Sequence, residues 1–195
     1  RRTRTRPIPS GRLQASKGLW FGIGLSAAGL VELALGVNLI SAGVAALTLG
    51  SYVAVYTPLK RRTSLATLVG AVPGALPPVI GWVAATGSLA LPALVLFGIA
   101  FFWQMPHFLA IAWLYRDEYA AAGIPLLPVL EPDGRCTGRQ ALLYSAALWP
   151  VSLMPPLVGL AGGFYLVVAT VLGLTLVGLS ARFARDRSIP DARRL

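Results

Sequence analysis

Charged residues are scarce in this sequence. Only 12% of its 195 residues are Asp, Glu, Lys or Arg, whereas 56% are hydrophobic. A soluble globular chain contains about 25% charged residues. The shortage excludes a disordered chain, which needs low hydrophobicity and high charge, and it argues against an ordinary water-soluble domain.

Cysteine and acidic residues are scarce as well. The single cysteine, Cys136, excludes a disulfide framework and any zinc site built from several cysteines. The sequence contains seven acidic and 17 basic residues, which gives a net charge of +10. In a nucleic-acid-binding protein the basic residues would cover a folded polar surface. Here they lie between apolar runs, so we expect no nucleic-acid partner.

Long apolar runs fill most of the chain. A helix crosses the bilayer core with about 20 residues, and the 21 glycines and 15 prolines are tolerated in such helices. We therefore predict an all-α integral membrane protein, a polytopic helix bundle forming one domain over residues 1–195. Its six predicted spans are Gly18–Val37, Leu39–Tyr56, Leu65–Ala85, Leu91–Tyr115, Ala141–Leu160 and Gly163–Phe183. Asn38, Thr86–Ala90 and Ala161–Gly162 are predicted to be tight turns between paired spans.

The basic residues are distributed unevenly around these spans. If successive spans alternate in direction, all 17 basic residues fall on one membrane face and none on the other. Loops rich in Lys and Arg face the cytoplasm. We therefore expect a multi-pass protein of the cell (inner) membrane with both ends and all basic loops in the cytoplasm.

Two polar residues lie inside the fourth predicted span. Gln104 and His107 are three residues apart and share a helix face, and Pro106 between them is expected to kink the helix. His107 is either a histidine that packs between helices, or a haem ligand or proton carrier. Glu118 follows 11 residues later, so an unbroken helix would place it on nearly the same face.

A Tyr-x-x-x-Lys pattern ends the second predicted span. Tyr56 and Lys60 would stack on one helix face, where both can donate to an anion. Pro58 argues against this arrangement, because it biases Thr57 away from helical geometry. In the third span, Pro73, Pro77 and Pro78 predict a kinked helix, either for close packing or to border a ligand cavity.

Basic and acidic residues are predicted to meet at the cytoplasmic face. Arg4, Arg6, Lys60 and Arg61 offer donors to a diphosphate or carboxylate. Acidic residues of the long connection 116–140 would add a bridging Mg²⁺, which uses one or two carboxylates plus phosphate oxygens. The pattern suggests a prenyl diphosphate site whose lipid tail lies among the spans. Phospholipid headgroups would bind the same basic residues.

Four segments together resemble a known family. They are Arg1–Leu13, Tyr56-Thr-Pro-Leu-Lys-Arg-Arg-Thr63, Trp103-Gln-Met-Pro-His-Phe108 and Tyr119-Ala-Ala-Ala-Gly-Ile-Pro-Leu-Leu-Pro-Val129. All are similar to the protoheme IX farnesyltransferase (haem O synthase) family, a branch of the UbiA-type intramembrane prenyltransferases. The Trp-Gln-x-Pro-His-Phe and Ala-Gly-Ile-Pro-x-Leu-Pro blocks are specific to that branch.

The resemblance implies a fold, a reaction and a site. The fold would be a helix bundle of about nine spans around a central cavity. The reaction would move a farnesyl group from farnesyl diphosphate to the 2-vinyl group of haem B with addition of water, giving haem O for haem-copper oxidases. Mg²⁺ would bridge the diphosphate, haem B would be a substrate rather than a cofactor, and pathway logic adds haem A synthase as a partner.

Site residues follow from the same match. Tyr56, Lys60, Asp117 and Glu118 would be catalytic, and Asp117 and Glu118 would also bind the metal. Arg4, Arg6, Arg61, Gln104 and His107 would bind substrate. Two departures matter: the family's first Asp-rich motif is absent, and Asp117-Glu-Tyr replaces two Asp residues four apart. Since the first residue is also not Met, we expect a fragment lacking both ends and inactive alone.

Two other functions stay open. The first is a UbiA-type prenyltransferase with a quinone-like acceptor, which would share the diphosphate chemistry and differ in the acceptor pocket. The second is a small membrane transporter, which would explain the spans and the broken third helix. A transporter would leave the convergence of an acidic loop and a basic cluster on one face unexplained.

Overall fold

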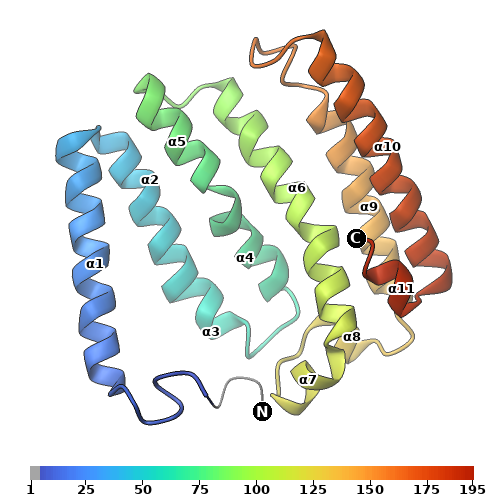
Figure 1. Cartoon of the computed structure of the whole chain (residues 1–195), viewed down its shortest axis with the longest axis horizontal. Coiled ribbons are helices and arrows are strands. Elements are labelled where there is room, and N and C mark those ends of the chain that lie inside the picture. Colours follow the sequence, from blue (N-terminus) through green and yellow to red (C-terminus); the bar gives the residue numbers. More distant parts are fainter. Residues whose placement is uncertain (1–4) are drawn as a thin grey trace.

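The computed structural model describes residues 5–195, and within them the chain forms helices and no strands (Figure 1). The long helices are α1 (Ala15–Gly36), α2 (Leu39–Gly50), α4 (Ala66–Ala75), α5 (Pro77–Thr86), α6 (Leu91–Leu114), α9 (Arg135–Ser152) and α10 (Gly163–Asp186). Short helices join or end them: the π-helix η1 (Ser51–Tyr56), α3 (Thr57–Leu59), α7 (Arg116–Ala121), α8 (Leu127–Leu130) and α11 (Ile189–Ala192). The all-helical prediction is confirmed.

Five stretches of the described chain are long and apolar enough to cross a membrane. They are Ala15–Gly36, Leu39–Leu59, Ala66–Thr86, Leu91–Leu114 and Gly163–Asp186, close to five of the six predicted spans. The third is interrupted at Leu76, because Pro77 and Pro78 follow it and cannot donate backbone hydrogen bonds. The chain is therefore a multi-pass membrane protein.

The predicted span Ala141–Leu160 has the wrong boundaries. Helix α9 begins at Arg135, where the Glu131 carboxylate accepts hydrogen bonds from the backbone N–H groups of Cys136 and Thr137. It ends at Ser152, and turns and irregular backbone follow as far as Gly162. The adjacent prolines at 155 and 156 have no N–H with which to extend it. The predicted tight turn Ala161–Gly162 is therefore only the end of a longer loop.

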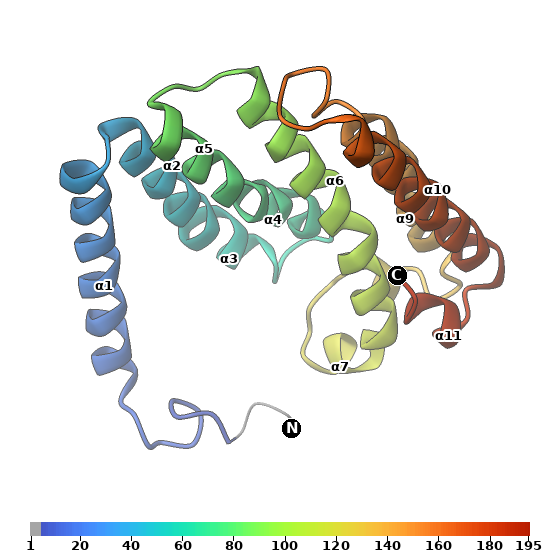
Figure 2. The same cartoon turned by 45° about the horizontal axis from the view of Figure 1, so that its top comes forward.

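The helices stand side by side in one curved row, with α6 near the middle (Figures 1 and 2). Helices α4 and α5 pack on one side of α6, and α9 packs on the other. Helix α1 lies at the edge and contacts mainly α2. This order leaves α6 as the wall shared by the two halves of the row.

The loops at one end of the bundle carry the described basic residues. We call this the basic end; it comprises the segment before α1, the α3–α4 loop, helices α7 and α8, and α11 (Figure 1). The α1–α2, α5–α6 and α9–α10 connections lie at the opposite end. The structure thus gathers the basic loops on one side, as alternating spans require.

Two buried clusters hold the row together. At the basic end, Trp113 packs edge-on against Phe183, and its indole N–H donates to the carbonyl oxygen of Arg187 at 3.1 Å. Toward the opposite end, Val79, Val83 and Ala93 form a second cluster between α5 and α6. The Asn38 amide donates to the carbonyl oxygen of Val83 at 3.0 Å and so ties α2 to this cluster.

Candidate functional site

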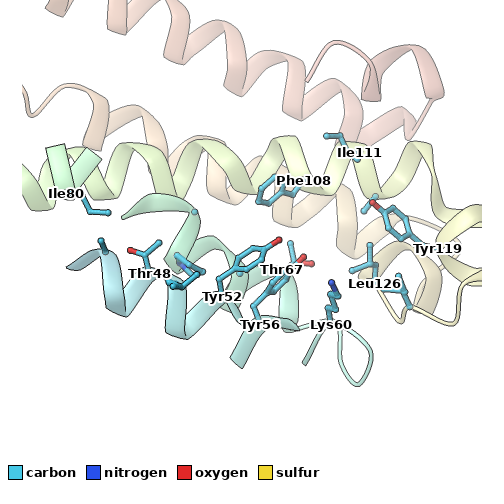
Figure 3. Close-up of a pocket in the computed structure, with 17 residues that line it drawn as sticks. Thr48, Tyr52, Tyr56, Lys60, Thr67, Ile80, Phe108, Ile111, Tyr119 and Leu126 are labelled. Carbon is cyan, nitrogen blue, oxygen red and sulfur yellow. The ribbon is translucent and has the colours of Figure 1, made fainter. Parts of the chain in front are cut away.

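A cavity of about 760 Å³ lies between the α2–η1–α3 segment, the α4–α5 pair, α6 and the α7–α8 connection (Figure 3). Its lining contains two predicted site residues, Tyr56 and Lys60. Most of the remaining lining is apolar. The other residues include Ala45, Thr48, Leu49, Tyr52, Thr67, Gly70, Pro73, Gly74, Ile80, Phe108, Ile111, Ala112, Tyr119, Ile124 and Leu126.

One stripe of side chains supplies a whole wall of this cavity. Ala45, Thr48, Tyr52, Tyr56 and Lys60 recur at intervals of three or four residues along α2, η1 and α3, so they share a face. Tyr56 and Lys60 lie toward the basic end, whereas Thr48 lies toward Ile80 at the other end of the cavity (Figure 3). The Thr48 hydroxyl donates to the carbonyl oxygen of Val44 within α2, so the stripe carries its charged group at the basic end and a satisfied hydroxyl in the membrane interior.

The π-helix keeps this stripe continuous past Pro58. Thr57 has helical dihedral angles (φ −63°, ψ −42°), and its N–H donates to the carbonyl oxygen of Tyr52, five residues back. The expectation that Pro58 would turn Thr57 out of the helix was wrong. A wider helical turn accommodates the missing proline donor, as π-bulges commonly do near functional sites.

Tyr56 and Lys60 meet as the spacing predicts. The Lys60 Nζ lies 5.7 Å from the centre of the Tyr56 ring, within the range of a cation–π contact. The ring lies directly on Gly70 of α4, where a Cβ atom would come within 2.6 Å of it. Close approach of α4 to η1 thus depends on glycine at this position.

Gln104 is buried between α6 and α4 and does not line the cavity. Its side-chain amide donates to the carbonyl oxygen of Ala71, and it rests on Gly74, one helical turn beyond Gly70. The contact clamps the broken third span to α6 beside the cavity.

His107 lies outside the cavity lining, on a neighbouring stripe of α6. It is half-buried, and its ring stacks on Trp103 with centroids 5.5 Å apart. Within residues 5–195 its ring nitrogens make no hydrogen bond. Trp103 also lines a smaller hollow of about 320 Å³ between α6, α9 and α10.

The sequence suggested one unbroken helix from His107 to Glu118, but the structure breaks the helix between them. Helix α6 ends at Leu114, Tyr115 takes a non-helical conformation (φ −112°, ψ 22°), and α7 starts a new direction at Arg116. The guanidinium of Arg116 lies 4.3 Å from the Trp113 ring, which fixes the start of α7. The break points the third residue of the Asp-Glu-Tyr motif, Tyr119, into the cavity mouth (Figure 3).

Asp117 and Glu118 lie at the protein surface, where their carboxylates can reach a metal ion. Both are exposed in the first turn of α7, and Asp117 pairs with Arg116 at 3.8 Å. Among the described residues no group of three or more His, Cys, Asp or Glu residues could hold a metal ion. Two exposed carboxylates do suit Mg²⁺, which keeps several waters and takes the rest of its ligands from phosphate.

The other two acidic residues of the long connection serve its structure. Glu131 caps the first turn of α9, and an Asp133 oxygen accepts from the backbone N–H of Arg135 at 3.1 Å. That backbone hydrogen bond, with Glu131 and the nearby charges of Arg135 and Arg187, lowers the pKa of Asp133. We therefore leave both out of the candidate metal site.

The predicted arginines are spread around the basic end. Arg61 is exposed in the α3–α4 loop beside Lys60, and Arg6 is exposed in the segment before α1. Arg4 lies outside the described residues. No cavity contact ties Arg6 or Arg61 to the lining.

Sequence reasoning missed several lining residues. Tyr119, Thr67 and Phe108 come from three different helices, so no spacing within one segment connects them. Thr48 and Tyr52 could have been found, because they precede Tyr56 by eight and four residues and fall on the same helix face.

Comparison with known proteins places this geometry in context. Residues 1–195 match the model of the UbiA prenyltransferase family. Three similar curated proteins, each named protoheme IX farnesyltransferase, come from Solibacter usitatus, Myxococcus xanthus and Koribacter versatilis. They are 56%, 50% and 46% identical over 98%, 92% and 98% of this chain. The chain spans 66%, 61% and 62% of their respective lengths.

A solved structure shares the fold. It comes from work on digeranylgeranylglyceryl phosphate synthase in membranes, with a TM-score of 0.81 over 98% of this chain and 68% of that one. Its sequence is only 18% identical, so it supports the architecture alone. The resemblance found in the sequence is confirmed by the family match and by the names of these relatives.

Proposed function

The chain belongs to the UbiA prenyltransferase family, and we propose that it transfers a farnesyl group from farnesyl diphosphate to the 2-vinyl group of haem B, forming haem O with addition of water. The observation that carries the proposal is the cavity, which joins a polar mouth at Tyr56, Lys60 and Tyr119 to an apolar interior. An amphiphile with a charged head and a prenyl tail fits such a gradient. The relatives named protoheme IX farnesyltransferase supply the acceptor.

Lys60 would bind the departing diphosphate. Its ammonium group lies over the Tyr56 ring at the mouth of the cavity. Arg61 beside it, with Arg4 and Arg6, adds positive charge at the same end of the bundle. Positive groups fixed where negative charge develops often make the largest single contribution to a rate enhancement.

Asp117 and Glu118 would hold the Mg²⁺ that such a diphosphate requires. When bound, the ion neutralises part of the phosphate charge and so improves diphosphate as a leaving group. Both carboxylates lie on α7, whose Tyr119 lines the mouth. The two exposed carboxylates and one lining residue therefore lie on the same short helix.

The cavity walls protect the allylic cation that forms when diphosphate leaves. Aromatic rings of Tyr52, Tyr56 and Phe108 line it, and ring faces stabilise cations. Apolar side chains around them exclude water that would quench the cation before the vinyl carbon attacks. The neighbouring aromatic residues Phe101, Phe102 and Trp103 of α6 do not line the cavity.

His107 is the residue we assign to haem. Its ring is held by Trp103, and among the described residues its nitrogens have no hydrogen-bond partner, so one of them is available to the iron. Arginines of the basic end would pair with the propionates. We further propose that the basic end faces the cytoplasm of the cell (inner) membrane and that haem A synthase receives the product.

A direct assay tests this function. Membranes containing the full-length protein are incubated with haem B, farnesyl diphosphate and Mg²⁺, and haem O is sought by mass spectrometry. We expect haem O from the unmodified protein and at least about tenfold less from Lys60→Ala, because one charged contact to the leaving group contributes about 1.5–3 kcal/mol.

The same assay separates the alternatives. Prenylation of a quinone precursor but not of haem would point to a different acceptor. The absence of any prenylated product would favour transport. Wild-type turnover by Lys60→Ala would remove Lys60 from the diphosphate site.

A further inference from the structure

We propose that Ala45 and Ile80 form the closed end of the cavity and fix the length of prenyl chain that this protein accepts. The inference rests on the proposed function, because it assigns the tail of the same prenyl diphosphate. Both residues line the cavity, and Ile80 marks the end farthest from Lys60 and Tyr119 in Figure 3. It gives a role to two lining residues that lie outside every motif found in the sequence.

The length of the lining stripe matches three isoprene units. Ala45 and Lys60 are 15 residues apart on the nearly continuous α2–η1–α3 segment, which spans about 22 Å at 1.5 Å per residue. An extended isoprene unit adds four carbons and about 5 Å, given C–C bonds of about 1.5 Å. A farnesyl tail therefore needs about 15 Å and leaves about 7 Å for the diphosphate beside Lys60. A fourth unit would bring the tail to about 20 Å and press it into the closed end.

Packed side chains stand immediately behind that end. Val79, the residue before Ile80, is buried in the cluster with Val83 and Ala93. Val44, the residue before Ala45, packs against the same cluster, as do Leu76 and Phe97. The tail consequently meets a densely packed floor rather than open space.

The floor is also held in place. The Asn38 side chain accepts a hydrogen bond from Ser41 N–H at 2.8 Å and donates to the carbonyl oxygen of Val83 at 3.0 Å. One residue thus fixes the start of α2 to the end of α5. A wall held by such contacts discriminates by size, and each methylene group that must be accommodated in an apolar pocket changes specificity about 10- to 200-fold.

Two substitutions move the floor in opposite directions. Ile80→Ala deepens the cavity, and we expect the ratio of kcat/KM for the C20 donor to that for the C15 donor to rise about tenfold. Ala45→Leu fills the end, and we expect kcat/KM for the C15 donor to fall about tenfold while the C10 donor is used at least as well as before. The measurement is prenyl transfer to haem B in membranes, with geranyl, farnesyl and geranylgeranyl diphosphates compared in parallel.

Size changes on α2 and on α4, at positions outside the lining, serve as controls. Ala46→Leu on α2 and Val72→Ala on α4 alter exposed residues that do not line the cavity, so their donor ratios should stay within twofold of the unmodified protein. Ile80→Val removes a single methyl group and gives a smaller shift toward the C20 donor if Ile80→Ala does not accumulate.

Unchanged donor ratios in Ile80→Ala or Ile80→Val and in Ala45→Leu, with active protein, would overturn the inference. Failure of the proposed function looks different, because the unmodified protein would then transfer none of the three donors.

Discussion

Two glycines of α4 set how closely its neighbours approach. Gly70 lies against the Tyr56 ring, and Gly74 lies against the Gln104 side chain, so adjacent turns receive one residue from η1 and one from α6. A methyl group at either position would collide with its neighbour. The position of the Tyr56–Lys60 pair in the cavity therefore depends on the absence of a Cβ atom at Gly70 of α4.

Gly70→Ala should displace Tyr56 and lower prenyl transfer. The added Cβ would lie 2.6 Å from the ring carbons, and overpacking of this kind costs about 1–3 kcal/mol. We expect turnover to fall about two- to twelvefold if half of that cost falls on the placement of Lys60.

Gly81→Ala is the matched control for that substitution. It changes a glycine of α5 whose added Cβ would meet no atom within 4 Å, so activity should be retained. Equal activity of the two variants would show that the ring contact does not position the site.

His107→Ala tests the proposed haem contact. Removing a ligand of the iron should shift the Soret band of the purified full-length protein loaded with haem, or weaken its haem affinity about tenfold or more. Leu94→Ala on the same helix changes a side chain that is 62% exposed and outside both hollows, and it should leave the spectrum unaltered. An unchanged spectrum and affinity in His107→Ala would make His107 a packing residue.

Local spacing predicted only part of this site. The Tyr56–Lys60 contact followed from a separation of four residues. The contribution of Tyr119 did not, because it depends on the break at Tyr115 that turns α7 toward the cavity. Gln104 was singled out as polar and intramembrane, but its partner on α4 lies 33 residues away in sequence, beyond the reach of periodicity.

Helix ends show why the predicted elements were less accurate than the predicted fold. Apolar runs mark where a helix can lie in a membrane, whereas its ends are set by capping groups. Glu131 caps the start of α9 in a polar stretch that is too hydrophilic to be predicted as part of a span. The prolines at 155 and 156 end the helix before the predicted end of the span at Leu160. Pro58 gave the opposite error: it predicted a helix end at Thr57, but a π-helix continues through this position.

Asn38→Ala should loosen the helices at the closed end of the cavity. The substitution removes the cap of α2 and the tie to Val83, at a cost of about 0.5–2 kcal/mol for the cap alone. We expect a lower thermal unfolding midpoint in detergent. Ser26→Ala, whose hydroxyl bonds only to Gly22 of its own helix, should leave the midpoint within error; an equal midpoint in both variants would show that the tie does not contribute.

Sidedness is a property of the whole bundle and can be tested with its single cysteine. Cys136 is exposed in the first turn of α9, which follows the α8 segment of the basic end, so an impermeant thiol reagent should label it in inside-out vesicles but not in intact cells. Ser88→Cys in a Cys136→Ser background places the thiol in the α5–α6 loop at the opposite end, and labelling should reverse. Labelling of both from one side would contradict the proposed topology.

The arrangement of the bundle was predictable in outline because alternating spans and one-sided basic residues both constrain it. The depth of the cavity was not, because its floor is made where α2, α5 and α6 meet far apart in sequence. The volume between helices depends on which side chains pack against each other, and the hydrophobic pattern of the sequence does not specify those contacts.

The continuous stripe on α2, η1 and α3 makes this stretch unusually intolerant of insertions and deletions. Residues in an α-helix advance by about 100° each, so removing one residue from Ser51–Tyr56 would rotate Lys60 away from the wall that Ala45 still faces. The head and the tail of a bound prenyl diphosphate would then be held by different sides of the helix. Substitutions can be absorbed along this segment one at a time, whereas a change in its length would uncouple both ends of the substrate at once.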